Sequence, residues 1–289
     1  MHDYMKAFPW SACFSLLLLL AAAPATALHA QATKIFVASF GNDGNDGSRG
    51  SPKRNFQAAH DAVAAGGQIV VLDTAGFGAL NITKSMSVTV PPGVNGFVSV
   101  TGINNAVTIN ASASATVSLR GLILEGGGGS GTSSHGILGS NVGHLVVEDC
   151  VVRNFDYGID LDQSTDGFLQ VHRGSVRGCT VAVLLQVENQ ANLRGIVTDC
   201  LIENNYEGLG VASGVGASAT LTASRCVLSG NNVALSPFGS SAIVYADDCR
   251  AQGNTKVLNI SDGLAYTLNN NSFTANGGSD NFTGSVPAH

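Results

Sequence analysis

A short pattern recurs about every 25 residues along most of this chain. It is clearest from Val147 to Leu161, where two short apolar runs flank a polar turn and a glycine. Its equivalent positions, 22 to 29 residues apart, are Gly121, Cys150, Gly174, Cys200, Cys226, Cys249 and Asn271. A period in this range is typical of solenoids, in which each repeat forms one coil of a stack.

The elements within each repeat are predicted to be short strands. The apolar runs around Cys150 and Cys200 are too short for helices and are interrupted by Asn, Asp and Gly. The second runs, 158–161 and 208–211, alternate apolar with small or polar residues, as a strand with one buried face does. One such coil cannot bury its own apolar face, whereas stacked coils can, so we expect an all-β solenoid.

Three columns of aligned residues support the stack. The first is apolar and expected to point inward: Ile123, Val152, Val176, Ile202, Leu228, Ala251 and Phe273. The second column holds the small residues at the position of Cys150, which are also expected to point inward. The third alternates in charge: Arg120, Asp149, Arg173, Asp199, Arg225 and Asp248. Because equivalent residues of stacked strands lie about 4.8 Å apart, we expect this column to set the register: a slipped coil would place like charges side by side.

These turns and strands resemble the right-handed parallel β-helix repeats of the pectate-lyase-like superfamily. The resemblance rests on 149–154, on 199–204 and on the glycine-led strands after them, and it covers roughly 34–275. The stretch 35–47, with 52–62 and 69–72 after it, resembles the opening segment of secreted bacterial members. The resemblance implies a right-handed parallel β-helix of eight or nine coils with a short N-terminal capping helix. It implies little about function, because this fold carries lyases, hydrolases, epimerases and adhesins.

The chain is expected to divide into four segments. Residues 1–30 are expected to be a signal peptide, with an apolar core at 14–23 and cleavage within 27–32. That core is too short to span a membrane, and no other segment is apolar enough, so we expect a secreted, periplasmic or cell-surface protein. Residues 31–66 are expected to form a strand and the capping helix, 67–275 the β-helix, and 276–289 a tail.

Composition and local motifs narrow the function. A net charge of −6 without clustered Lys or Arg offers no electrostatic case for nucleic acid. The five cysteines after Cys13 lack metal-type spacing and are expected to pack as free thiols, with Cys179 outside the inward column. The segment 41–47 is read as an Asx/Gly turn rather than a calcium loop, because Arg54 stands where an EF-hand needs Glu. The glycine-rich stretch 125–135 is read as a surface loop.

Ionisable and aromatic residues gather in one region of three or four coils. They are His135, Arg153, Asp156, Tyr157, Asp160, Asp162, Arg177, Tyr206 and Glu207. Among known β-helix enzymes, the polygalacturonases need paired carboxylates, but Tyr157, Thr180 and Val181 stand at those positions, which excludes that branch.

The lyase branch needs a cluster of acids for calcium and a basic side chain. Asp160 and Asp162 are the acidic candidates, and Arg153 and Arg177 are candidates for the base and the substrate clamp. We expect Asp156 and Asp160 to pair with the arginines, which could equally be solvated turn residues.

Two functions remain open. The first is non-catalytic binding of an extracellular or cell-surface polysaccharide, or a structural surface role. His135, Asp156, Tyr157, Tyr206 and Glu207 would then contact the glycan. The alternative is a polysaccharide lyase or related enzyme acting on uronate-type polymers, with calcium as its cofactor. No cofactor and no metal ligands are expected for the first function.

Overall fold

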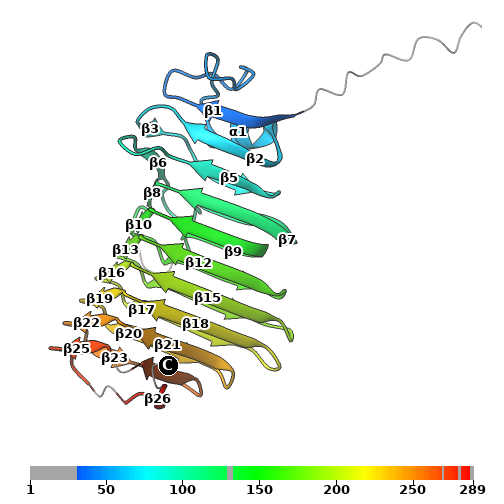
Figure 1. The fold of residues 1–289 in the computed structure, drawn as a ribbon. Helices are drawn as coiled ribbons and strands as arrows, with labels where there is room; N and C mark the ends of the chain where they lie inside the picture. Colours follow the sequence, from blue (N-terminus) through cyan, green and yellow to red (C-terminus); the bar gives the residue numbers. More distant parts are fainter. Residues whose placement is uncertain (1–30, 129–132, 269, 279–280, 287–289) are drawn as a thin grey trace, which may run out of the picture. The chain divides into compact units, whose positions relative to one another are not determined.

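The computed structural model describes residues 31–128, 133–268, 270–278 and 281–286. These residues form one compact unit, a parallel β-helix in which successive coils stack from β1 to β26 (Figure 1). The predicted all-β fold class with a short N-terminal helix is therefore confirmed. The expected signal peptide, 1–30, lies outside the described residues. Among the residues described, no helix is long and apolar enough to cross a membrane.

Each full coil contributes three strands, which stack into three rows. Row 1 consists of β4 (Leu80–Ile82), the first part of β7 (Val107–Arg120), the first part of β9 (His135–Glu148), β11 (Tyr157–Gln163), β14 (Val181–Val187), β17 (Glu207–Ser213), β20 (Val233–Phe238) and β23 (Lys256–Leu258).

Row 2 consists of β1 (Ala32–Val37), β2 (Val63–Val71), β5 (Met86–Thr89), the last parts of β7 and β9, β12 (Gly167–His172), β15 (Asn192–Thr198), β18 (Ser218–Ser224), β21 (Ala242–Asp247), β24 (Leu264–Leu268) and β26 (Gly284–Val286). Rows 1 and 2 together form a 17-stranded sheet.

Row 3 is a separate nine-stranded sheet. Its strands are β3 (Ala75–Gly76), β6 (Gly96–Ser99), β8 (Leu122–Glu125), β10 (Val151–Arg153), β13 (Ser175–Arg177), β16 (Leu201–Glu203), β19 (Val227–Ser229), β22 (Arg250–Gln252) and β25 (Ser272–Thr274).

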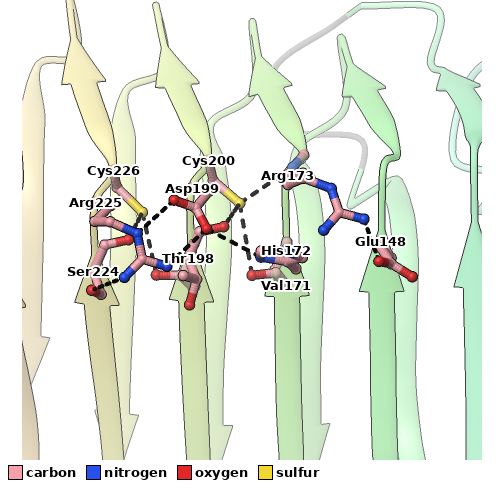
Figure 2. A network of polar contacts seen from close by, with 12 residues as sticks. Glu148, Val171, His172, Arg173, Thr198, Asp199, Cys200, Ser224, Arg225 and Cys226 are labelled. Carbon is pink, nitrogen blue, oxygen red and sulfur yellow. Dashed lines mark hydrogen bonds and ion pairs between the residues drawn. The ribbon is translucent and has the colours of Figure 1, made fainter.

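The chain turns from row 2 into row 3 at one residue in the left-handed region. This residue is Gly121, Asp149, Arg173, Asp199, Arg225 or Asp248, with φ between 49° and 74°. The alternating charges lie at this turn and pair as predicted. Arg225 Nε lies 2.7 Å from Asp199 Oδ1, and Figure 2 shows Arg225 and His172 reaching the same carboxylate from the two neighbouring coils.

The predicted alignment is wrong by one residue at the first of these coils. Ile123 pairs with Val151, so Leu124 and not Ile123 belongs to the apolar column of Val152. Gly121 correspondingly occupies the turn column of Asp149. Arg120 lies one position earlier than predicted, although its Nε still reaches Asp149 Oδ2 at 3.2 Å. The long loop after this coil interrupts the repeat. The apolar pattern alone does not specify the register of the coil before the loop.

A ladder of buried asparagines lines the turn from row 3 into row 1. Each Nδ2 donates to the Oδ1 of the next coil, at 2.9–3.0 Å, along Asn205, Asn231, Asn254 and Asn276. Each Nδ2 also donates to a backbone carbonyl of an earlier row 3 strand. These residues satisfy buried polar groups at a corner where the chain leaves its strand, which a buried turn requires.

The five cysteines among the described residues are free and buried, as predicted. Cys150, Cys200, Cys226 and Cys249 occupy the inward column, and Cys179 lies at the head of the asparagine ladder, where its N–H donates to Asn205 Oδ1 at 2.9 Å. Burial raises the pKa of Cys150 to about 12, so this thiol stays protonated and packs as a small apolar group.

The two ends of the stack differ from each other. Near the first coils, α1 (Phe56–Ala62) buries Phe56 against Phe77, with ring centroids 5.1 Å apart. The segment 41–47 is organised by hydrogen bonds, because the carboxylate of Asp43 accepts the backbone N–H groups of Arg54 and Asn55 at 2.9 Å. At the other end, β26 pairs with β24, so a strand lies within the segment 276–289 that was expected to be a tail.

Candidate functional site

The region predicted from the sequence lies on two faces of the β-helix. His135, Tyr157, Asp160, Asp162 and Glu207 belong to row 1. Arg153 and Arg177 end strands of row 3, across the turn. The two remaining residues lie at the corner: Tyr206 is 59% exposed, and Asp156 is buried and accepts the backbone N–H of Ser134 at 3.1 Å.

His135 is held between two acceptors and a tyrosine ring. It pairs in register with Tyr157, and the rings stack with centroids 4.8 Å apart and planes 13° from parallel. Its Nε2 lies 3.2 Å from Asp160 Oδ2, and its Nδ1 lies 3.2 Å from Asn105 Oδ1. The backbone N–H of His135 also donates to Asn105 Oδ1, which fixes the orientation of that amide. Nδ1 therefore carries a proton, and both ring nitrogens are engaged.

Asp160 is a buried carboxyl in an outward-facing position. It is 4% exposed, and its Oδ1 has no hydrogen-bond partner among the described residues. Burial raises the pKa of Asp160, and the hydrogen bond from His135 opposes that shift. In row 1, Asp160 lies between Leu138 and Leu184 of the neighbouring coils.

Acidic groups surround Tyr157. Burial is the largest cause that raises the pKa of the Tyr157 hydroxyl. The negative charges of Asp160, Asp156, Glu207 and Asp162 raise this pKa further. Burial also raises the pKa of Glu207. Among the described residues, however, no three His, Cys, Asp or Glu side chains are arranged to hold a metal ion. The acidic side chains around Tyr157 therefore do not fit a calcium site.

A cavity of about 640 Å³ lies beside His135 on the preceding coils. Asn105, which bonds the His135 ring, also lines this cavity. The other lining residues are mostly amides and hydroxyls: Asn81, Ser99, Thr101, Asn104 and Thr108, with Ala79, Val100 and Ile103. None of the predicted site residues comes from 68–120, because this stretch carries few ionisable groups. The amide and hydroxyl side chains on alternate positions of β4 and β7 were the available signal.

The arginines of row 3 have partners other than those expected. Arg153 Nη2 donates to Glu125 Oε2 at 2.7 Å, and Arg177 Nη1 lies 3.8 Å from Glu203 Oε1. The predicted pairing with Asp156 and Asp160 is wrong, because the turn after Arg153 sends those carboxylates onto the corner and row 1. Arg153 and Arg177 line a second cavity of about 370 Å³ with Glu125, Asn154, Gly178 and Asn204.

Comparisons with known proteins concern the fold. No protein-family profile matches the chain, and no similar curated sequence is found. The solved structure of the pectate lyase Pel9A aligns with a TM-score of 0.64 and 13% identity, over 88% of this chain and 72% of that one. A GH136 lacto-N-biosidase from Eubacterium ramulus aligns with a TM-score of 0.46 and 10% identity, over 89% of this chain and 67% of that one. A rhamnogalacturonan lyase aligns with a TM-score of 0.38 and 9% identity, over 81% of this chain and 75% of that one.

At 13% identity, the likeness to Pel9A shows a shared architecture and not a shared activity. This shared architecture agrees with the stacked rows of strands, with the turns made at residues of positive φ, and with the resemblance noted in the repeats. The chain is a parallel β-helix with an architecture similar to that of Pel9A.

Proposed function

We propose that the protein binds a polysaccharide, without cleaving it, on the outward face of row 1. The observation that carries this proposal is the His135–Tyr157 stack beside a cavity lined with amide and hydroxyl groups. Aromatic rings pack against the apolar faces of sugars, and amides and hydroxyls match sugar hydroxyl groups in both donor and acceptor roles. Asp162, on the strand of Tyr157, and Glu207, two coils further along, would accept hydrogen bonds from sugar hydroxyls. Tyr206 would add an exposed ring at the corner.

The state of His135 favours binding over catalysis. A general base needs a free lone pair within reach of the proton that it removes. Both nitrogens of His135 face acceptors, and its side chain is only 13% exposed. Its partner Asp160 is buried and bonded to it, so neither group is presented to a substrate. The pair is better suited to hold Tyr157 and Asn105 in place than to transfer protons.

The proposed setting is outside the cell or at its surface. It follows from the expected signal peptide at 1–30 and from the resemblance of 35–72 to secreted proteins. The structural neighbour Pel9A, a pectate lyase, is consistent with an extracellular glycan as the partner. N-terminal sequencing of the exported chain would test this directly, and we expect the mature protein to begin within 27–32.

The binding proposal is tested with Tyr157→Ala on a glycan array, followed by calorimetry on each glycan that binds. We expect the variant to bind at least about tenfold more weakly, since stacking on an aromatic ring and the order that it imposes on His135 are both lost. Tyr245→Ala is the matched control, because Tyr245 stacks on Tyr266 in row 2 with centroids 5.4 Å apart. Equal affinity of Tyr157→Ala and the native protein would refute this site.

The second candidate is a lyase acting on uronate-type polymers. The observation in its favour is a buried carboxyl of raised pKa, Asp160, hydrogen-bonded to a histidine beside a cavity. Absorbance near 235 nm reports the unsaturated product, with and without added calcium. An increase that disappears in both Asp160→Ala and Arg177→Ala would favour this candidate. No increase across a panel of uronate polymers would leave only binding.

A further inference from the structure

Row 3 carries a line of four charged side chains on its outward face. Glu125, Arg153, Arg177 and Glu203 occupy equivalent positions of β8, β10, β13 and β16. The two arginines are therefore direct neighbours on adjacent strands, which lie about 4.8 Å apart. Like charges in this arrangement repel each other, and a stack selected only for stability would avoid them.

The hydrogen-bonding capacity of the two arginines is largely unused. Arg153 makes one bond, from Nη2 to Glu125, and its buried Nε has no partner among the described residues. Arg177 lies 3.8 Å from Glu203, which is beyond hydrogen-bond distance. Each guanidinium offers five donors in a planar fork. The unused Nη donors of this pair are thus available to a ligand or to water, whereas Arg153 Nε is buried.

Other arginines of the same stack show what a structural pairing looks like. Arg225 donates from Nε and Nη2 to the two oxygens of Asp199, at 2.7 and 2.9 Å. Arg173 does the same with Asp149, at 2.8 and 3.1 Å, and also contacts Glu148 (Figure 2). In that column the charges alternate from coil to coil. The row 3 pair has neither the alternation nor the two-bond geometry.

The open donors face space that a ligand could fill. The cavity of about 370 Å³ is lined by Glu125, Arg153, Asn154, Arg177, Gly178 and Asn204. A Cβ at Gly178 would lie 2.7 Å from Asn154 Oδ1, so a side chain there would displace that amide. The two asparagine side chains add neutral polar groups to the lining.

We propose that Arg153 and Arg177 together bind one oxyanion, the carboxylate or sulfate ester of an extracellular polymer. The planar guanidinium fork matches the spacing of two oxygens on such a group. One oxyanion between the arginines would offset their mutual repulsion. Glu125 and Glu203 bring the charge of the four side chains to zero, so the site accepts a single anionic group of the polymer. That the polymer is a glycan rests on the proposed function; the anion site does not.

The test is affinity electrophoresis of the folded chain at low salt. Three gels contain dextran, carboxymethyl-dextran or dextran sulfate, which share one backbone and differ in their charged group. The variants are Arg177→Ala and Arg177→Lys, where the lysine keeps the charge and loses the fork. Arg225→Ala is the matched control, because it removes the same charge from a half-exposed arginine that lies outside the cavity. Far-UV circular dichroism establishes that each variant is folded.

We expect a charged dextran to retard the native chain and neutral dextran to have no effect. Retardation by carboxymethyl-dextran identifies a carboxylate ligand, and retardation by dextran sulfate identifies a sulfate ester. Arg177→Ala and Arg177→Lys should both weaken binding, the alanine variant by about tenfold, as expected for lost charge-assisted hydrogen bonds. Arg225→Ala should bind as the native chain does. Should Arg177→Ala not fold, the lysine variant decides the question.

Two outcomes overturn the proposal. One is that neither charged dextran retards the native chain. The other is an equal loss in Arg225→Ala and Arg177→Ala, which would indicate unspecific attraction to surface charge. Failure of the row 1 site is distinguishable from both results: a silent glycan array, or Tyr157→Ala with native affinity, refutes that site and leaves retardation by charged dextrans unaffected.

Discussion

Replacing Asn231 with alanine should destabilise the β-helix strongly. Asn231 is 1% exposed in the middle of the asparagine ladder. Its Oδ1 accepts the backbone N–H and the Nδ2 of Asn205, and its Nδ2 donates to Ile202 O and to Asn254 Oδ1, all at 3.0 Å. Alanine would remove these four hydrogen bonds from a buried corner, because a methyl group can replace none of them. The backbone N–H of Asn205 and the carbonyl of Ile202 lose this partner, whereas Asn205 Nδ2 keeps Val176 O and Asn254 Oδ1 keeps the backbone N–H of residue 231.

The expected loss in the free energy of unfolding follows from these broken hydrogen bonds. A buried group that loses its partner costs about 1–3 kcal/mol, and the two groups that keep a second partner add less. Neighbouring groups that share a site also relax together, so the four costs do not add fully. We therefore expect a loss of about 3–5 kcal/mol in the free energy of unfolding. At roughly 2–4 °C per kcal/mol for a chain of this size, the melting temperature should fall by about 6 to 20 °C.

Urea titration followed by circular dichroism measures this loss, with Asn276→Ala as the matched control. Asn276 ends the ladder in a half-buried position, where water can replace its side chain, so its loss should be about 1 kcal/mol. Losses of equal size at Asn231 and Asn276, or a loss below about 1 kcal/mol at Asn231, would refute the view that the ladder supports the stack.

Three further predictions concern packing, charge and pH. Gly158→Ala should lose about 1–3 kcal/mol in urea titration, because its Cβ would lie 2.5 Å from Ala182 O, whereas Gly50→Ala, with open space around it, should change little. Arg173→Asp should lower stability at low salt and much less in 1 M NaCl, since it places like charges beside Asp149; a salt-independent loss would contradict the charge ladder. Burial raises the folded-state pKa of Glu207 above 4.5, so its charged form disfavours folding, and the stability of the native chain should fall as the pH rises through that pKa. Glu207→Gln should therefore be more stable than the native chain at pH 8 and as stable as the native chain near pH 4. Equal stability of the two chains at both pH values would contradict this.

Much of the fold follows from local patterns in the sequence. Strand alternation and a 25-residue period act within one coil or between adjacent coils, so they can be read without knowing the tertiary structure. The inward cysteines and the turn charges were predicted on this basis. A short helix was expected within 31–66, the segment in which α1 lies. The exception is the coil at Gly121, whose register differs by one residue because the glycine-rich loop after it obscures the repeat.

The candidate site could not be predicted to the same degree. Arg153 and Tyr157 are four residues apart in sequence, and the predicted patch treated them as one surface. The left-handed turn at Asn154 separates them onto row 3 and row 1, which gives Arg153 the partner Glu125 and gives Tyr157 the partner His135. The cavity beside His135 was missed because its lining is uncharged.

The sequence by itself determined that this chain stacks into coils, which residues point inward, and that its charges alternate along one turn. These properties depend on period and polarity, which each repeat carries locally. Only the tertiary structure decided which side chains meet across coils: the Asn105–His135–Asp160 contacts, the asparagine ladder and the neighbouring arginines of row 3. The physical reason is that such contacts join residues 22 to 30 positions apart, and their distances depend on the register and the corner geometry of every coil between them.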